Sequence, residues 1–286
     1  MISTPIRRYG AAILMLLTAA FSGEVIAKTH AQTTSYKAHT SSQKHSKASS
    51  SSKKVSSKLA SSKQEYSRNS AKSSSLPDLR KYPSGTPRKK AFLRTVMPYI
   101  TSQNAAITAE RNWLVSKQYD NRWSPTERAR LKDIAKRYKV SWSGNTRRIP
   151  WNTLLDRVDI IPDSMVATMA AAESGWGTSK LARNNNNLFG MKCAKGRCNN
   201  GPGKVKGYSQ FDSVKESVGA YAANLNTNPA YASFRKSRAQ LRKADQEVTA
   251  SNMIHKLSGY STQGKRYNNY LFAMYQDNQR LIAAHM

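Results

Sequence analysis

The fold follows from residues 162 to 174, which read Pro-Asp-Ser-Met-Val-Ala-Thr-Met-Ala-Ala-Ala-Glu-Ser. A proline suits the start of a helix because its fixed φ is already helical and its missing N–H has no partner there. Val166, Met169 and Glu173 recur at i, i+3 and i+7, which places them on one helix face. Gly175 follows, and glycine is common just past a helix end. The stretch predicts a helix whose buried face carries an acidic side chain in its last turn.

The same helical spacing recurs on both sides of this stretch. Residues 124–127, Ser-Pro-Thr-Glu, form a capping box with proline at the first helical position. Apolar side chains follow one another at helical intervals over residues 214–225 and again over residues 267–281. These stripes predict helices that bury one face, so the fold class we expect is mainly α.

Two segments depart from a regular helix. Pro98 falls inside the apolar stripe of residues 92–100. Because proline lacks an N–H and clashes with the preceding turn, we expect it to kink or break that helix. Residues 199–211 are rich in glycine, with Val205 and Tyr208 between polar side chains, which predicts a short β-hairpin or a loop.

The 286 residues include 47 Lys and Arg against 16 Asp and Glu, a formal net charge of +31. So large an excess predicts attraction to anionic polymers or surfaces. Two cysteines are too few for a disulfide-rich scaffold. No apolar run reaches the ~18 residues that a spanning helix needs. We expect a soluble protein or one held at a surface.

The N-terminus has the pattern of a secretory signal. Arg7 and Arg8 precede an apolar stretch over residues 10–21, and residues 25–27 offer small side chains for cleavage. We interpret residues 1–27 as a cleaved signal peptide, which predicts a periplasmic protein; the alternative is an uncleaved N-terminal anchor.

Three further segments follow. Residues 28–75 contain 17 Ser among 48 residues, with ten basic side chains and one acid, too few apolar groups to fold alone. We expect a disordered basic tail, either in electrostatic contact with an anionic wall or membrane surface or serving as a spacer. Residues 76–149, with 17 basic and 5 acidic side chains, predict a linker and a helical accessory region. Residues 150–286 are the expected catalytic domain.

Most chemistries are excluded by what the sequence lacks. His255 and His285 have no acid or cysteine at ligand spacing, so we expect no metal, and no other cofactor motif is present. Without a nucleotide-binding glycine loop or a G-x-S-x-G elbow, the chain is not a kinase, dehydrogenase or α/β-hydrolase. We expect no nucleic-acid partner, because the basic residues are not interleaved with aromatics on one face. Carboxylate chemistry remains.

Glu173 is the outstanding carboxylate. Burial and the negative end of the helix dipole both favour its protonated form, which is the form that a general acid needs. The alternative is a side chain that reaches past the helix end to solvent.

Two motifs carry a resemblance. Residues 172–179 read Ala-Glu-Ser-Gly-Trp-Gly-Thr-Ser, and residues 186–192 read Asn-Asn-Leu-Phe-Gly-Met-Lys. Together they resemble the signature of the bacterial glucosaminidase family of peptidoglycan hydrolases, relatives of the flagellar rod-assembly hydrolase, over roughly residues 150–286. The resemblance implies a lysozyme-like α-helical fold and cleavage of the β-1,4 bond after N-acetylglucosamine in peptidoglycan strands. It makes Glu173 the catalytic acid.

Glycoside hydrolysis needs a second group beside the acid. Family members often carry a second Glu on a hairpin, but residues 201–208 contain lysines and no acid. Glu216 matches a family position, although with Ser213 it also forms a capping box. The other route is assistance by the substrate's own N-acetyl group. Tyr260 is the candidate to position that group, in an element resembling the family's C-terminal one that includes Tyr267; both tyrosines are alternatively core aromatics.

The sugar chain needs stacking surfaces, amide-binding groups and close backbone approach. The predicted substrate-binding residues are Trp176, Asn187, Phe189, Gly190, Tyr208 and Tyr267. For the aromatic members, packing in the core is the competing interpretation. Cys193 and Cys198 enclose a four-residue turn, and in an oxidising compartment we expect them to form a disulfide.

Three functions remain open at this point. The main hypothesis is a periplasmic peptidoglycan β-N-acetylglucosaminidase. A lytic transglycosylase or muramidase on the same scaffold would use a single Glu. A non-catalytic wall-binding protein would retain the fold and lack the second catalytic group.

Overall fold

The computed structural model describes residues 75–193 and 201–286. The predicted signal peptide (1–27) and basic tail (28–75) lie outside this part of the chain, except for Ser75. No helix among the described residues is long and apolar enough to span a membrane.

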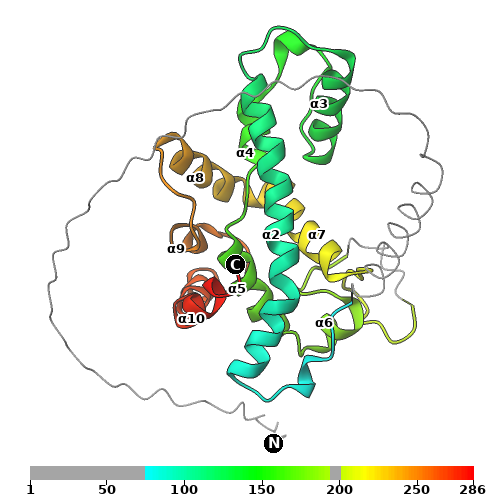
Figure 1. The fold of residues 1–286 in the computed structure, drawn as a ribbon, viewed down its shortest axis with the longest axis vertical. Coiled ribbons are helices and arrows are strands. Elements are labelled where there is room, and N and C mark those ends of the chain that lie inside the picture. The colour runs from blue at the N-terminus through cyan, green and yellow to red at the C-terminus, as the bar shows by residue number, and fades with distance from the viewer. Residues whose placement is uncertain (1–74, 194–200) are drawn as a thin grey trace, which may run out of the picture. The chain divides into compact units, whose positions relative to one another are not determined.

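The described residues are mainly helical, as the apolar spacing predicts (Figure 1). The helices are α2 (Thr86–Lys117), α3 (Pro125–Arg137), α4 (Trp151–Arg157), α5 (Asp163–Ser174), α6 (Lys180–Asn185), α7 (Val214–Thr227), α8 (Ala232–Lys243), α9 (Ala250–Met253) and α10 (Lys265–Ala283). Four 3₁₀ turns join them: η1 (Leu79–Lys81), η2 (Thr146–Arg148), η3 (Pro229–Tyr231) and η4 (Ile254–Lys256).

Helix α5 lies at the centre of this arrangement, against α2 and α10. Its side chains from Met165 to Ala171 are all buried, so the helix is covered on every side rather than on the one face that the sequence indicated. Its alanines leave room for neighbouring helices to approach. Gly175 ends the helix in the left-handed conformation, with φ 58°.

Helix α2 is continuous through Pro98, so of the kink or break that the sequence predicts, the break does not occur. Val96, Met97 and Ile100 on either side of the proline are all buried in one hydrophobic cluster with α5. Packing on both sides of the proline outweighs the lost backbone hydrogen bond, which is the usual way in which tertiary context overrides local propensity.

Polar contacts also fix α5 to α2. The Thr101 hydroxyl donates to Asp163 at the start of α5, at 3.0 Å. The Asn104 amide donates to the other Asp163 oxygen and to the backbone oxygen of Ile161, the latter at 2.6 Å. Both donors belong to α2, so the start of the helix that carries Glu173 is set by the region before residue 150.

The core consists of two hydrophobic clusters, and α2 runs through both. The large cluster joins residues 76–100 to residues 161–282 and surrounds α5. The small cluster joins residues 107–158 and Ala222, with Trp113, Trp123, Trp142 and Trp151 packed against it. The predicted boundary at 149/150 therefore does not separate two cores, because the first part of α2 belongs to the large cluster.

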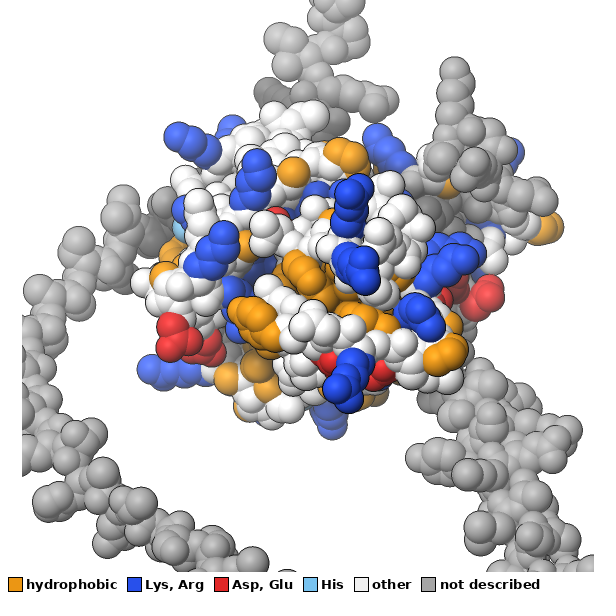
Figure 2. Space-filling view, turned by 90° about the horizontal axis from the view of Figure 1, so that it is seen from above, with side chains coloured by type: hydrophobic (Ala, Val, Ile, Leu, Met, Phe, Trp, Pro, Cys, Tyr) orange, Lys and Arg blue, Asp and Glu red, His pale blue; other side chains and the backbone are white. Residues whose placement is uncertain are grey.

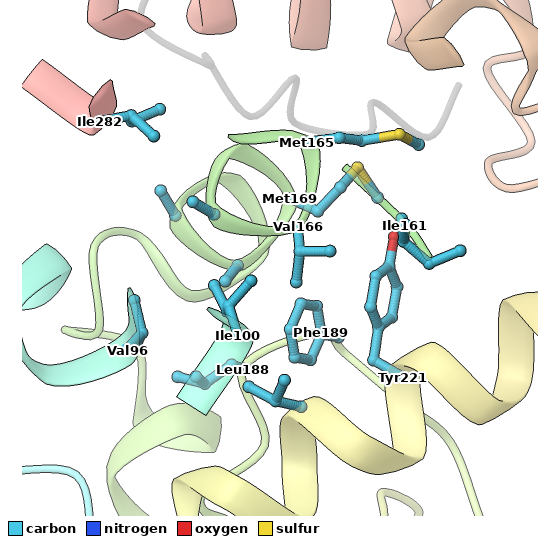
Figure 3. Close-up of a cluster of buried hydrophobic side chains, with 14 of the residues drawn as sticks. Val96, Ile100, Ile161, Met165, Val166, Met169, Leu188, Phe189, Tyr221 and Ile282 are labelled. Carbon is cyan, nitrogen blue, oxygen red and sulfur yellow. The ribbon is translucent and has the colours of Figure 1, made fainter. Parts of the chain in front are cut away.

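Figure 3 shows how the large cluster meets the loop after α6. Val166 and Met169 of α5 face Phe189 and Tyr221, whose rings stack with centroids 4.0 Å apart and an angle of 6° between their planes. The Leu188 and Phe189 side chains are buried here, and Tyr221 comes from the predicted stripe of α7.

The predicted β-hairpin is not formed in the described residues. Lys192 and Tyr208 make an isolated antiparallel bridge, and no strand extends from it in the described parts of the chain on either side. Gly203 and Gly207 have positive φ, which interrupts an extended ladder. Residues 194–200 lie outside the described chain.

Figure 2 shows basic side chains spread over the face seen from above, with few acidic ones among them. This distribution matches the net charge of +31. A surface of this kind raises the local concentration of anionic polymers.

Candidate active site

A cleft of about 480 Å³ opens beside the C-terminal end of α5. It is lined by Glu173, Phe189, Gly190, Met191, Lys192, Tyr221, Asn224, Tyr231, Tyr260, Ser261, Gln263 and Tyr267. We call it the Glu173 cleft. Among its described lining residues Glu173 is the only carboxylate.

Glu173 lies in the last turn of α5 and is half-buried. The Tyr267 hydroxyl, from the first turn of α10, donates a hydrogen bond to Glu173 Oε1. On the other side, a Cβ built on Gly190 would lie 3.4 Å from Glu173 Oε2. Gly190 has φ 63°, so a side chain here would be strained and would also contact the carboxyl group. The loop backbone thus comes close to the acid because residue 190 is glycine.

Two tyrosines stack in the cleft. The rings of Tyr260 and Tyr267 have centroids 5.7 Å apart and planes inclined by 16°. The Tyr260 hydroxyl lies 3.5 Å from the backbone oxygen of Phe189. Burial, followed by the nearby charge of Glu173, raises the pKa of Tyr260 well above its usual value. Burial and the hydrogen bond to Glu173 raise the pKa of Tyr267. Both hydroxyls therefore stay protonated near neutral pH and serve as hydrogen-bond donors.

The predicted site residues divide into two groups. Glu173, Tyr260, Tyr267, Phe189 and Gly190 come together at one cleft although the chain separates them. The predicted residues that do not line this cleft are Trp176, Asn187, Tyr208 and Glu216.

Asn187 braces the loop that borders the cleft. Its side chain is 1% exposed. The Asn187 amide donates to the backbone oxygens of Met191, at 2.8 Å, and Ser209, at 2.9 Å. Its oxygen accepts from the Met191 N–H at 3.0 Å. These bonds occupy the groups that the sequence assigned to the sugar, and they fix the loop instead.

Trp176 and Glu216 have partners elsewhere. The Trp176 ring packs edge-on against Phe92 of α2 at 5.6 Å, with the Lys89 amine 5.1 Å from its centroid. The Glu216 N–H donates to Ser213 Oγ at 3.1 Å, while Glu216 Oε2 accepts from the Asp212 N–H at 2.7 Å. Glu216 thus caps the start of α7, the alternative that its spacing left open.

Residues 150–280 match the model of a family described as glucosaminidase, mannosyl-glycoprotein endo-beta-N-acetylglucosaminidase. Over all 286 residues the chain is 82% identical to Protein bax of Escherichia coli strain K12, with 100% of both chains covered. The chain belongs to the glucosaminidase family. No solved structure matches it.

The glucosaminidase match contains every residue that lines the Glu173 cleft. It supports a glycosidase-type enzyme that acts on glycans, which is the coarse function that the two motifs at residues 172–179 and 186–192 predict.

The sequence did not predict every residue that lines the Glu173 cleft. Tyr221 belongs to the apolar stripe of α7, and nothing in its spacing distinguishes a core ring from one that borders a cleft. Asn224 lies one turn further along the same helix, and Tyr231 ends η3. A search for polar residues on the α7 stripe would have found Asn224; Tyr231 carries no such signal.

In the described parts of the chain, no group of three His, Cys, Asp or Glu side chains could hold a metal ion. Cys193 directly follows the bridge residue Lys192, but Cys198 lies outside the described residues, so their disulfide stays a prediction.

Proposed function

We propose that the protein is a peptidoglycan hydrolase, an endo-β-N-acetylglucosaminidase that cleaves the β-1,4 bond after N-acetylglucosamine with Glu173 as general acid. The observation that carries this proposal is the Glu173 carboxyl group in the cleft, held by the Tyr267 hydroxyl. Peptidoglycan is favoured over glycoprotein as the substrate by the two motifs and by the export signal predicted at residues 1–27.

The two carboxyl oxygens of Glu173 have different surroundings. Oε1 accepts the hydrogen bond from Tyr267, which fixes the plane of the carboxyl group. Oε2 faces the backbone at Gly190, where the absence of a side chain leaves it accessible. A proton on Oε2 is in position to pass to the leaving oxygen of the glycosidic bond, which is the task of the general acid.

Substrate assistance supplies the second group in this proposal. The cleft contains no second carboxylate among its described lining residues. The carbonyl oxygen of the substrate's N-acetyl group would bond to the anomeric carbon as the bond to the leaving oxygen breaks and Glu173 gives up its proton. Water would then attack the anomeric carbon, break its bond to the acetamido oxygen so that the N-acetyl group is restored, and give one proton to Glu173. The Tyr260 hydroxyl, on a partly buried ring that stacks against Tyr267, is the candidate that orients the acetamido group.

A lytic transglycosylase is the second candidate, favoured by the same single carboxylate. In that reaction a hydroxyl of the substrate itself, rather than water, attacks the anomeric carbon. The product is an anhydro-muramic acid end. A non-catalytic wall-binding protein would yield neither product.

Mass spectrometry of the muropeptides released from sacculi separates these candidates. Wild-type protein is expected to release fragments with a reducing N-acetylglucosamine end and the added mass of water. Glu173→Gln should release none, whereas Glu216→Gln, which changes a carboxylate outside the cleft, should release the wild-type set. If the released fragments carry anhydro-muramic acid ends, the enzyme is a transglycosylase and not a hydrolase. If wild-type protein releases no fragments, only the wall-binding function remains.

Export would bring the enzyme to this substrate. We place the mature chain in the periplasm, with residues 28–75 in electrostatic contact with an anionic wall or membrane surface. Cell fractionation tests the location. Deleting residues 28–75 should weaken retention on sacculi most at low salt, where the Debye length reaches ~30 Å at 0.01 M. If the truncated protein is retained on sacculi as well as the full-length protein at every salt concentration, the tail is only a spacer.

A further inference from the structure

Lys192 is the one cationic side chain among the described residues that line the Glu173 cleft. Its side chain is exposed, and no acidic side chain in the described parts of the chain pairs with its amine. The remaining polar lining residues other than Glu173 are neutral: Asn224, Ser261, Gln263 and the tyrosines. The described lining of the cleft thus carries a single positive charge, that of Lys192.

The backbone at Lys192 is held firmly. Lys192 forms the antiparallel bridge with Tyr208. The next hydrogen bond runs from the Ser209 N–H to the Met191 oxygen at 2.9 Å. Asn187 bonds both the N–H and the oxygen of Met191. The amine therefore extends from a fixed part of the cleft wall, which restricts the region that it searches.

A neutral glycan gives this amine nothing to pair with. A polymer of N-acetylglucosamine, or the core of a glycoprotein glycan, presents only hydroxyl and acetamido groups to the cleft. A peptidoglycan strand presents carboxylates, either on its peptide stems or, where the stem has been removed, on the lactyl group. A positive charge in a cleft wall attracts such groups and discriminates against substrates without them.

We infer that Lys192 is a specificity-determining residue that selects carboxylate-bearing glycan strands over neutral ones. This inference rests on the proposed glycosidase function and adds its substrate class. Lys192 acts by pairing with a group on the substrate's side branch. Glu173 performs the bond cleavage.

Lys206 provides a matched control. It lies in the same loop region, two residues before the Tyr208 bridge, and is exposed like Lys192. It does not line the cleft. Lys206→Gln therefore removes the same charge from the protein without removing it from the cleft, so any general effect of net charge on binding to anionic strands appears in both variants.

The test compares three glycans: a neutral β-1,4 N-acetylglucosamine oligomer, glycan strands freed of peptide, and strands with peptide stems. We expect Lys192→Gln to lower the ratio of kcat/KM for the acidic strands to kcat/KM for the neutral oligomer by about two- to five-fold, the size of a partly exposed ion pair. Lys192→Glu should lower it further because it adds repulsion. Lys206→Gln should leave the ratio at its wild-type value. Raising the salt concentration should lower the ratio of kcat/KM for acidic strands to kcat/KM for the neutral oligomer more in the wild type than in Lys192→Gln.

Binding gives a readout that does not depend on turnover. Calorimetric titration of the Glu173→Gln protein, with and without Lys192→Gln, measures the affinity for each glycan. A loss confined to stem-bearing strands would place the paired carboxylate on the peptide; a loss on both acidic glycans would include the lactyl carboxylate. Equal affinities for neutral and acidic glycans, or equal losses in the Lys192 and Lys206 variants, would overturn the inference. Failure of the proposed function appears separately, as the absence of new reducing ends with wild-type protein.

Discussion

Asp159 and Glu173 are carboxylates in two neighbouring regions of the molecule, and their surroundings differ. Asp159 lies in the segment between α4 and α5, is 1% exposed, and faces three arginines. The closest of them is Arg242, at 3.0 Å. Glu173 lines a cleft and is held by a neutral tyrosine hydroxyl. The contrast teaches that a carboxylate surrounded by positive charge is committed to structure, whereas one held by a neutral donor keeps an oxygen available for proton transfer.

The arginines around Asp159 come from two distant helices. Arg111 belongs to α2, and Arg238 and Arg242 belong to α8. Arg238 also donates to the backbone oxygens of Asp156, at 2.8 Å, and Ile160, at 2.8 Å. Burial lowers the pKa of Arg238 to about 10, which leaves it charged at neutral pH. This charged group therefore fixes the segment between α4 and α5, just before the helix that carries Glu173.

The largest expected effect is on catalysis by Glu173. Glu173→Gln keeps the shape of the side chain and loses the proton, so the rate of sacculus clearance should fall by ~10² to 10⁴. Thermal unfolding should change little, because the Tyr267 hydroxyl still has an amide oxygen to bond. Clearance at near wild-type rate would remove Glu173 from the mechanism.

The second effect is on stability at Asp159. Asp159→Asn leaves three arginines without their shared counter-charge, and breaking a buried ion pair costs about 3–5 kcal/mol. Denaturant unfolding measures this loss, and the activity per folded molecule should be retained. Asp133→Asn is the control, since Asp133 pairs with Arg137 on an exposed helix face, where such a pair contributes at most about 1 kcal/mol. Similar losses in both variants would contradict the comparison.

Tyr267→Phe should lower kcat by up to about tenfold, because the lost hydrogen bond to the protonated acid contributes about 0.5–1.5 kcal/mol and orients the carboxyl group. Steady-state kinetics separates kcat from KM. An unchanged kcat would mean that the cleft positions Glu173 without Tyr267.

The raised pKa values of Tyr260 and Tyr267 predict a loss of folded-state stability at alkaline pH. The pKa values of Tyr260 and Tyr267 are raised in the folded state, so the folded protein holds protons that the unfolded chain releases above about pH 10. This contribution to stability is complete below that pH and is lost as the pH rises towards the folded pKa values. Denaturant midpoints from pH 8 to 11 should fall for the wild type and fall less for Tyr260→Phe.

The smallest effect is expected at Glu216. Glu216→Ala removes the hydrogen bond to the Asp212 N–H at the start of α7, so unfolding should become easier by about 0.5–2 kcal/mol. The catalytic rate should not change, because Glu216 does not line the Glu173 cleft. A rate collapse without loss of stability would restore Glu216 as a second catalytic carboxylate.

Sequence alone determined the features that depend on neighbours within a few residues. The helix at residues 163–174, the capping box at Ser124 and the α7 stripe are local patterns of spacing and capping, and the structure confirms them. The two family motifs likewise lie in short continuous stretches. A mainly α fold and the choice of Glu173 as the candidate acid follow from these alone.

Only the tertiary structure decided what depends on residues far apart in the chain. Tyr267 bonds Glu173 across 94 residues of sequence, and Arg242 reaches Asp159 across 83. No local pattern marks Arg242, and the C-terminal element that marks Tyr267 does not indicate that its hydroxyl bonds Glu173. Packing against α5 also keeps α2 continuous through Pro98, and glycines with positive φ replace the expected hairpin by a single bridge. For the two carboxylates and for α2, the physical reason is that long-range burial and pairing between distant residues exceed the local preferences that a sequence pattern records.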